Sequence, residues 1–338
     1  MWKNILLLTS VVGLLSGGAA YAHKTIASPA ATIALPGAVH GIDFDDLQFF
    51  PALNRVAVPA AQTGDLDLID SQTNAVEVIP HVAVTTAAPH GDDRGATSAS
   101  FGGGYIFTGD HGRTSIAVVD PRSKSVVARV RLAANYDYIR YVASRQEVWV
   151  TEPHQHRIEI FKFLNSAKPT LRHEAFIEVP GGPEALVIDN ERGRAYTNLW
   201  SNRALAIDLS GRRIVARWPN GCRQSRGLAL DGRWLFAGCK EGRAVALDVT
   251  RGGKPVSAAR TGAGVDIIAY NSHLHHLYVP GSKSATLTVL SVAGNGHLQP
   301  VAVYRTVKGA HCVATDNRRK AFVCDPRHGR ILVIDDHR

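Results

Sequence analysis

The chain has 338 residues, a formal net charge of +9 and four cysteines. A chain of this length can bury a sufficient core without the disulfide bonds on which small secreted domains depend. The basic balance favours anionic partners such as nucleic acid, but the basic residues are spread out and no run of five or more marks a binding tail.

The N-terminus, MWKNILLLTSVVGLLSGGAAYAHKT, has the features of a secretory signal peptide. A single early cation, Lys3, precedes an apolar run at 5–15, and small residues end in A-Y-A at 20–22. These features predict cleavage before His23 and a periplasmic or secreted bacterial protein without a membrane anchor. A retained anchor is the alternative, although the apolar run is short for a bilayer span. We expect residues 23–338 to form a single domain.

Short apolar or alternating runs recur along the rest of the chain, and no long stretch has helical periodicity. Examples are RVAV, SIAVVD, EVWVTE, RAYTNL and ILVID, each bounded by turn-forming residues. Runs of this kind are strand signals, and many of them at even spacing indicate an all-β repeat architecture.

The repeat is clearest at 184–208, which reads EALVID, RAYTNL and ALAID with short connections between the runs. A polar residue opens the first strand, a tight turn leads to the second, and a short loop leads to a third that ends in Asp. Aligning the opening residue gives seven units at intervals of about 40 to 54 residues. The seven opening residues are His40, Arg94, Arg140, Glu184, Arg226, Asp266 and His311.

The seventh unit is short, because the chain after His311 supplies only three strands. A fourth strand is available in ATIALPG, at Ala31–Gly37. A circular array needs such a segment, since a first strand that completes the last blade closes the ring and removes exposed edges. The sequence therefore predicts an all-β, seven-bladed β-propeller closed by the mature N-terminal strand. An eight-bladed ring is the structural alternative.

The stretch PEALVIDNERGRAYTNLWSNRALAIDLSGRRIVARW resembles the YVTN-type repeat of the YncE-like β-propellers, and HGRTSIAVVDPRSKSVVARV and HGRILVID are similar to it. The resemblance covers nearly all of the chain after residue 22. It implies an exported bacterial propeller with WD40-like repeats and no single established chemistry. Because YncE-like members have been linked to DNA binding, the resemblance also implies nucleic acid as a partner. GDDRGATSAS and YDYIRYVAS depart from the pattern, so the register of blades two and three stays open.

The repeat also predicts which side chains meet. In a propeller blade the first strand lies nearest the axis, so its opening residue sits at one mouth of the central channel. The seven opening residues therefore form a predicted ring of ionisable side chains. The loops between second and third strands lie at the same mouth, further out. These loops add Gln62, Asp110, His111, Glu152, His154, His156, Trp200, Lys240 and His328.

A mouth lined by such groups predicts a binding site for a small polar ligand or a partner protein. A wet channel whose ring charges only pair with one another is the alternative. A divalent metal is a further alternative, with His40, His311, His111 and His154 as ligands, because neutral imidazole suits copper, zinc or nickel. Such a metal would make the chain a metal-dependent lyase or hydrolase, with Glu184 able to complete the shell.

The stretch from His311 to His328 contains two cysteines and two histidines, which together look like a zinc site. The predicted hairpin separates them. Cys312 and Cys324 fall opposite each other across its turn at Arg318, as an expected non-hydrogen-bonded pair within disulfide reach. An exported protein holds its cysteines paired more often than free. We therefore predict the disulfide Cys312–Cys324, which disfavours a zinc site in this stretch.

The other two cysteines lie in the fifth unit. Cys239 is expected to face Ser225 or Arg226 across its hairpin, and Cys222 lies a few residues upstream in the incoming loop. A disulfide Cys222–Cys239 would tie that loop to the second strand. Both predicted disulfides would then hold the chain beside a ring residue and keep the mouth rigid.

The sequence as a whole predicts an exported, monomeric β-propeller that binds a small polar ligand or a partner protein at the mouth. It leans against an enzyme, because no general base has a partner at a fixed spacing and no catalytic residue can be assigned. A metal-dependent lyase or hydrolase is the alternative. Nucleic-acid binding through the positive charge is a third reading, and it predicts affinity that falls steeply with salt.

Overall fold

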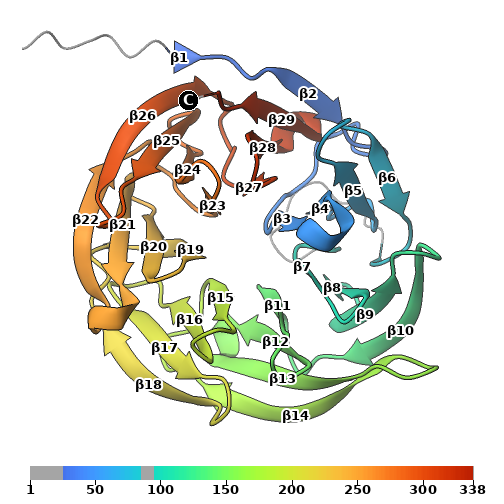
Figure 1. The fold of residues 1–338 in the computed structure, drawn as a ribbon. Helices are drawn as coiled ribbons and strands as arrows, with labels where there is room; N and C mark the ends of the chain where they lie inside the picture. Colours follow the sequence, from blue (N-terminus) through green and yellow to red (C-terminus); the bar gives the residue numbers. More distant parts are fainter. Residues whose placement is uncertain (1–25, 85–94, 338) are drawn as a thin grey trace, which may run out of the picture.

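The computed structural model describes residues 26–84 and 95–337. These residues form seven β-sheets arranged in a ring around a central channel, and they contain no α-helix (Figure 1). The predicted seven-bladed β-propeller is confirmed. No helix within the described ranges is long and apolar enough to cross a membrane. The predicted signal peptide and Arg94 lie outside the described residues.

Each blade is a sheet of four strands that run in order from the channel to the rim. Blade one contains β3 (Gln48–Phe50), β4 (Arg55–Pro59), β5 (Leu66–Asp70) and β6 (Val76–Ile79). Blade two contains β7 (Ala99–Gly102), β8 (Tyr105–Asp110), β9 (Ser115–Asp120) and β10 (Ser125–Arg131). Blade three contains β11 (Ile139–Val142), β12 (Glu147–Glu152), β13 (Arg157–Leu164) and β14 (Thr170–Glu178).

The second half of the ring repeats this plan. Blade four contains β15 (Leu186–Asp189), β16 (Arg194–Asn198), β17 (Ala204–Asp208) and β18 (Arg213–Trp218). Blade five contains β19 (Ser225–Asp231), β20 (Trp234–Cys239), β21 (Arg243–Asp248) and β22 (Lys254–Arg260). Blade six contains β23 (Ala269–Asn271), β24 (His276–Gly281), β25 (Thr286–Val292) and β26 (Leu298–Arg305). Blade seven contains β27 (Val313–Thr315), β28 (Lys320–Asp325), β29 (Arg330–Asp335) and β2 (Ala31–Ala34).

The ring closes where the N-terminal segment meets the C-terminal blade. β2 is the outer strand of blade seven and runs antiparallel to β29, with Ile33 opposite Ile331. This pairing confirms the closing strand predicted from the sequence. A shorter strand, β1 (Ile26–Ala27), adds to blade six in parallel with β26. The N-terminal segment therefore spans the rims of the last two blades (Figure 1).

The blades pack face to face through the apolar side chains of their alternating strands. The largest fully buried side chain is Trp149 on β12, and its indole N–H donates to Glu147 at 2.9 Å. Burial of an indole is stabilising when its single donor has a partner, as here. The core lies between neighbouring blades, as in the clusters shared by blades one and two and by blades five and six.

Four short 3₁₀ turns shape the loops: η1 (Pro51–Leu53), η2 (Pro153–Gln155), η3 (Val249–Arg251) and η4 (Pro326–His328). η2 and η4 fill second-to-third strand loops, on the side of the ring that the sequence marks as the mouth. η4 ends at Gly329, which has a φ of 55°. A Cβ there would lie 2.1 Å from the carbonyl oxygen of Ala38, so glycine lets the N-terminal loop cross blade seven.

Candidate functional site

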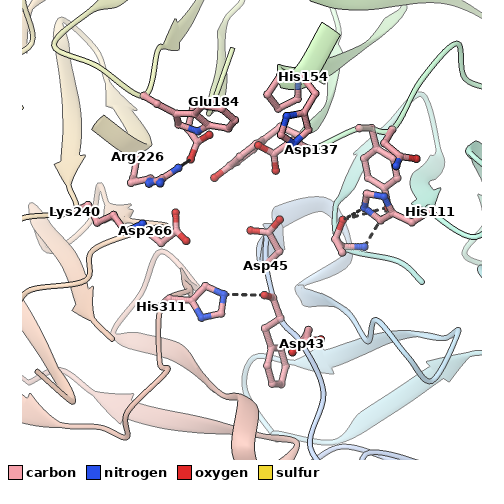
Figure 2. Close-up of a pocket in the computed structure, with 17 residues that line it drawn as sticks. Asp43, Asp45, His111, Asp137, His154, Glu184, Arg226, Lys240, Asp266 and His311 are labelled. Atoms are coloured by element: carbon pink, nitrogen blue, oxygen red, sulfur yellow. Dashed lines mark hydrogen bonds and ion pairs between the residues drawn. The ribbon is translucent and has the colours of Figure 1, made fainter. Parts of the chain in front are cut away.

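A cavity of about 350 Å³ opens at the mouth of the channel, and all seven blades contribute to its lining. This volume lies within the range of small-molecule sites in proteins. Its walls carry ionisable groups of both signs together with tyrosine and tryptophan rings. Figure 2 shows the carboxyl groups of Asp45, Asp137, Glu184 and Asp266 around the middle of this cavity.

Backbone hydrogen bonds show which residue of each blade opens onto the mouth. Three bonds of one kind link neighbouring inner strands: Asp46 N to Thr97 O (3.0 Å), Gly227 N to Asp266 O (2.8 Å) and Ile267 N to His311 O (3.0 Å). Within blades three and four, Asp137 and Glu184 make matching bonds to their second strands. The positions so related are Asp45, Thr97, Asp137, Glu184, Arg226, Asp266 and His311. We call these seven residues the mouth ring, and all of them line the cavity.

The predicted ring coincides with the mouth ring in blades four to seven, at Glu184, Arg226, Asp266 and His311. The predictions in blades one and three need correction, and the residue predicted in blade two lies outside the described residues. His40 is exposed in a turn before the first strand and does not line the cavity, and Asp45 takes its place. The error arose because residues 41–47, GIDFDDL, alternate like a strand. Ile42, Phe44 and Leu47 are buried, but the segment is an extended loop ahead of β3.

Arg140 is the second correction. It lies within β11 and lines a different cavity of about 560 Å³ instead of the mouth cavity. Asp137, three residues earlier, is the mouth-ring residue of blade three. In blade two, Arg94 is outside the described residues and Thr97 holds the ring position.

Asp45 and Asp137 are the least compensated acids of the ring. Neither forms an ion pair with a cationic side chain of the described ranges. Burial raises the pKa of Asp45 well above its usual range, and the charges of Asp266 and Asp46 raise it further. Burial also raises the pKa of Asp137, followed by the charge of Asp45. The charges of Asp46, Glu184 and Asp266 act on both carboxyl groups in the same direction, so the protonated form is favoured at each.

Glu184 is buried and has a cationic partner, because Nη1 of Arg226 lies 2.6 Å from its Oε1. Burial nevertheless raises the pKa of Glu184 to about 7 against the opposing effect of Arg226, and Asp266 adds to the rise. The Arg226 guanidinium also lies 5.8 Å from the ring centroid of Trp200, which is 38% exposed at the mouth. Lys240 lines the same wall, and no ion pair within the described ranges holds its ammonium group.

The four histidines suggested as metal ligands are not gathered at one point. His40 is outside the cavity, and His154 packs edge-on against Trp200 with ring centroids 5.7 Å apart. Nε2 of His111 lies 2.9 Å from the Thr97 hydroxyl. His311 has Nδ1 at 2.6 Å from one backbone carbonyl and Nε2 at 2.8 Å from another. Each ring nitrogen of His311 therefore faces a backbone carbonyl, and neither is directed at a point shared with the other three histidines.

Both predicted disulfides are present. Cys222 and Cys239 are bonded with Cα atoms 5.1 Å apart, and Cys312 and Cys324 with Cα atoms 5.6 Å apart. The expected register of Cys239 opposite Ser225 is confirmed. The second pair was expected to be non-hydrogen-bonded, but the Cys324 N–H donates to the Cys312 carbonyl at 3.2 Å.

The fold separates the two cysteines and two histidines between His311 and His328, which together looked like a zinc site in the sequence. Ligand atoms of His311, Cys312 and Cys324 lie within 4.8 Å of one another, the only such group found among the described residues. Both sulfur atoms are bonded to each other, so neither is available as a thiolate. His328 lies in η4, half-exposed, with Nδ1 bonded to Asp325 at 2.9 Å.

The predicted outer-loop residues divide into two groups. His111, His154, Trp200 and Lys240 line the cavity. The others are engaged in local structure or are exposed: Gln62 bonds Asp43, Asp110 pairs with Arg113, Glu152 pairs with Arg157, His328 bonds Asp325, and His156 is exposed at the end of η2.

Several cavity residues were missed in the sequence, and three of them bear on the chemistry of the site: Asp45, Asp137 and Tyr138. Tyr138 lines both the mouth cavity and the second cavity, so it stands between the two. Its side chain is 5% exposed, and its hydroxyl makes no hydrogen bond with the described parts of the chain. The motif YDY at 136–138 holds two of the three, and an acid between two aromatic residues before a strand was the available signal.

No protein-family model matches the chain, and no curated protein sequence matches it at a significant level. Solved β-propeller structures do match. A chain in the crystal structure of the mitotic checkpoint complex has a TM-score of 0.73 and 11% identity, covering 99% of this chain and 100% of that one. The RRP9 WD40 repeats have a TM-score of 0.71 and 11% identity, covering 92% and 99%.

Hydrazine synthase of Kuenenia stuttgartiensis also matches, with a TM-score of 0.70 and 12% identity, covering 88% of this chain and 96% of that chain. Likeness at such low identity shows the fold alone, which is a seven-bladed β-propeller with WD40-like structural neighbours. The YncE-like resemblance stays an expectation from the repeat motifs.

Proposed function

We propose that this chain is an exported, monomeric binding propeller of the YncE-like type that holds a small polar ligand in the mouth cavity. The observation that carries the proposal is the cavity itself. Its lining combines ionisable groups of both signs with an exposed indole, at the point where all seven blades converge. A concave site with a few convergent polar groups is the usual form of a ligand pocket.

Export to an oxidising compartment fits the two disulfides, which are rare in reducing compartments. The proposal includes cleavage before His23. N-terminal sequencing of protein purified from the periplasm or medium should begin at His23. A first residue upstream of position 20 would contradict the cleavage site.

A metal-dependent enzyme that uses the same cavity is the weaker hypothesis. His40 is directed elsewhere, and both ring nitrogens of His311 face backbone carbonyls. Nucleic-acid binding at the mouth is also disfavoured, because Asp45, Asp137 and Asp266 would repel phosphate groups there.

A partner protein is the second candidate. Two apolar side chains are exposed at the mouth side: Val39, 84% exposed, and Trp200. Tryptophan is enriched at the centres of protein interfaces. The matched chain of the mitotic checkpoint complex belongs to a structure named for a protein assembly, which supports this use of the scaffold without identifying a partner.

The test uses the intact mature protein and the fluorescence of Trp200, read as the difference from a Trp200→Phe variant. Free amino acids, monosaccharides, alkylamines and short carboxylates serve as probes, with thermal shift as a second readout. We expect saturable binding by at least one probe class, weakened at least fivefold by Lys240→Met or Asp266→Asn.

The matched controls are Lys254→Met on β22 and Glu191→Gln in the turn after β15, both exposed and outside the cavity. They should leave affinity within twofold. Absence of saturable binding by every probe, or equal losses in the cavity and control variants, would refute a small-ligand site.

A further inference from the structure

Building on the proposed function, we infer that the ligand of the mouth cavity is an organic cation, whose amine or guanidinium group is held between Asp45 and Asp137. The inference names the class of ligand, which the proposed function leaves open. It rests on the arrangement of charge, on an unpartnered hydroxyl and on the spacing of the acids.

Some charged side chains of the cavity are paired with one another, and others lack a partner of opposite charge. Arg226 is committed to Glu184 at 2.6 Å, and the two His311 nitrogens are committed to backbone carbonyls. Asp45 and Asp137 lie without a cation at ion-pair distance in the described ranges. Partly buried carboxylates are stabilised by N–H donors with positive charge, and a ligand with such donors would supply what the protein does not.

Tyr138 provides an independent indication of a ligand. Its side chain is 95% buried and lines the cavity beside the two acids, yet its hydroxyl makes no hydrogen bond within the described chain. The hydroxyl oxygen itself is not fully buried, so it opens onto cavity space and is available to a ligand. The charges of Asp45 and Asp137 raise the pKa of Tyr138, after the larger effect of burial. The hydroxyl is therefore within electrostatic range of both acids and can accept a hydrogen bond from a cation held there.

The spacing of the acids favours an organic cation over a metal ion. Within the described residues, no three of the ring carboxylates bring ligand atoms within 4.8 Å of one another. A calcium ion needs several oxygen ligands at about 2.3–2.6 Å. The acids instead surround a cavity of about 350 Å³, which suits a molecule with several heavy atoms. The exposed Trp200 ring adds a face for cation–π contact with such a molecule.

Binding of a cation should be linked to proton release. Burial and the neighbouring acids raise the pKa of both Asp45 and Asp137, so a cation that binds between the ionised carboxylates would displace protons from them. The charged and titratable groups around the pair are Asp43, Asp46, His111, Tyr136, Tyr138, Arg140, His154, Glu184, Arg226, Lys240, Asp266 and His311. Because burial and neighbouring acids keep the pair protonated at low pH, affinity should rise as pH rises, by up to about tenfold per unit.

The experiment measures binding of three probes to the mature protein by isothermal titration calorimetry. The probes are agmatine, 1,4-diaminobutane and butyrate, each at pH 5, 6, 7 and 8 in buffers of different ionisation enthalpy. We expect one-site binding of agmatine or diaminobutane, tightening with pH and releasing close to one proton. Butyrate should not bind detectably.

Isosteric variants assign the effect to residues. Asp45→Asn and Asp137→Asn should each weaken the amine at least tenfold at pH 8 and abolish proton release. Tyr138→Phe should weaken binding severalfold and leave the pH dependence in place. Glu191→Gln is the matched control for a lost carboxylate and should change nothing. If Asp45→Asn fails to fold, Asp137→Asn carries the same test from a different blade.

Three outcomes overturn the inference. The first is butyrate binding more tightly than either amine, and the second is calcium chloride binding through Asp45 and Asp137 and displacing the amines. The third is no binding of amines at millimolar concentration. If neutral or anionic probes then bind in a manner that depends on Lys240, the inference about cations fails while the proposed small-ligand site survives.

Discussion

Asp45 and Asp46 are adjacent in the chain, but they lie at different cavities of the channel and in opposite environments. Asp46 is fully buried and accepts bonds from Arg140 at 2.5 and 2.9 Å, from Ser98 at 2.6 Å and from Gln48 at 3.0 Å. Asp45 faces the mouth cavity, where its principal neighbours are other acids.

The surroundings of Asp46 show that this fold can compensate a channel carboxylate completely. Side chains from three blades converge on Asp46, and the Arg140 guanidinium also lies 4.8 Å from the Tyr138 ring centroid. One residue away the same scaffold leaves Asp45 beside Asp137 with no cationic partner at ion-pair distance in the described ranges. We interpret the end of the channel around Asp46, where the carboxylate is fully paired, as structural. We interpret the mouth around Asp45, where the carboxyl group has no cationic partner, as the binding end.

The largest expected effect comes from breaking the compensated end. Arg140→Met leaves Asp46 buried without its cation, and removal of one partner of a buried pair costs about 3–5 kcal/mol. Urea unfolding at pH 7 should show this loss in the free energy of unfolding. Arg172→Met is the control, since Arg172 forms an exposed pair with Glu174 and should cost less than about 1 kcal/mol. A similar small loss for both variants would contradict the comparison.

The second prediction concerns the disulfides beside the mouth, whose removal should lower both stability and affinity. The variant with both Cys312→Ser and Cys324→Ser removes a disulfide that closes a short loop, which costs about 3 kcal/mol. Because His311 precedes this disulfide, amine affinity at the mouth should fall as well. The Cys222→Ser and Cys239→Ser pair serves as comparison, beside Arg226. Unchanged affinity in both pairs would show that the disulfides do not hold the mouth rigid.

A smaller, pH-dependent effect is expected at an uncompensated acid away from the channel. Asp67 on β5 is fully buried, and neither carboxyl oxygen has a hydrogen-bond partner in the described chain. Burial, with a contribution from Asp65, raises its pKa to about 7. A raised pKa means that the folded state holds the proton more tightly than the unfolded state. The stability that the protonated Asp67 contributes is therefore fully present below the pKa of an unfolded aspartate, about 4, and is lost as the pH rises through 7.

We therefore compare the free energy of unfolding of the Asp67→Asn variant with that of the natural protein. The difference should favour the variant by about 2–3 kcal/mol more at pH 8 than at pH 5. Urea unfolding of both proteins at the two pH values measures this difference. Equal effects at pH 5 and pH 8 would show that Asp67 is ionised in the folded protein throughout. Asp67 lines neither channel cavity, so amine affinity should not change in this variant.

The sequence predicted the architecture well because the repeat and its closure are written in local patterns. Strand runs, tight turns and the missing fourth strand of blade seven all follow from short stretches such as ILVID and ATIALPG. The cysteine pairs were equally local, since a hairpin turn determines which residues face each other.

The mouth ring was harder to predict in blades one to three, because its positions depend on bonds between blades. The bond from Asp46 N to Thr97 O joins residues that are far apart in the sequence. GIDFDDL looks like a strand by alternation, and only packing against blade seven shows that it is an extended loop. In blade three, Arg140 followed by YVAS matched the repeat pattern better than Asp137 did, although Asp137 makes the equivalent backbone bond.

The pairing of β2 with β29 has a consequence for the order of events during synthesis. A ribosome makes residues 31–34 long before residues 330–335, so the ring has no closing partner until β29 has been synthesised. Blades one to six can form earlier, as units of local hairpins. Ring closure must then bring together two strands that lie far apart in the sequence, and a truncation that removes β29 should leave an open, aggregation-prone arc.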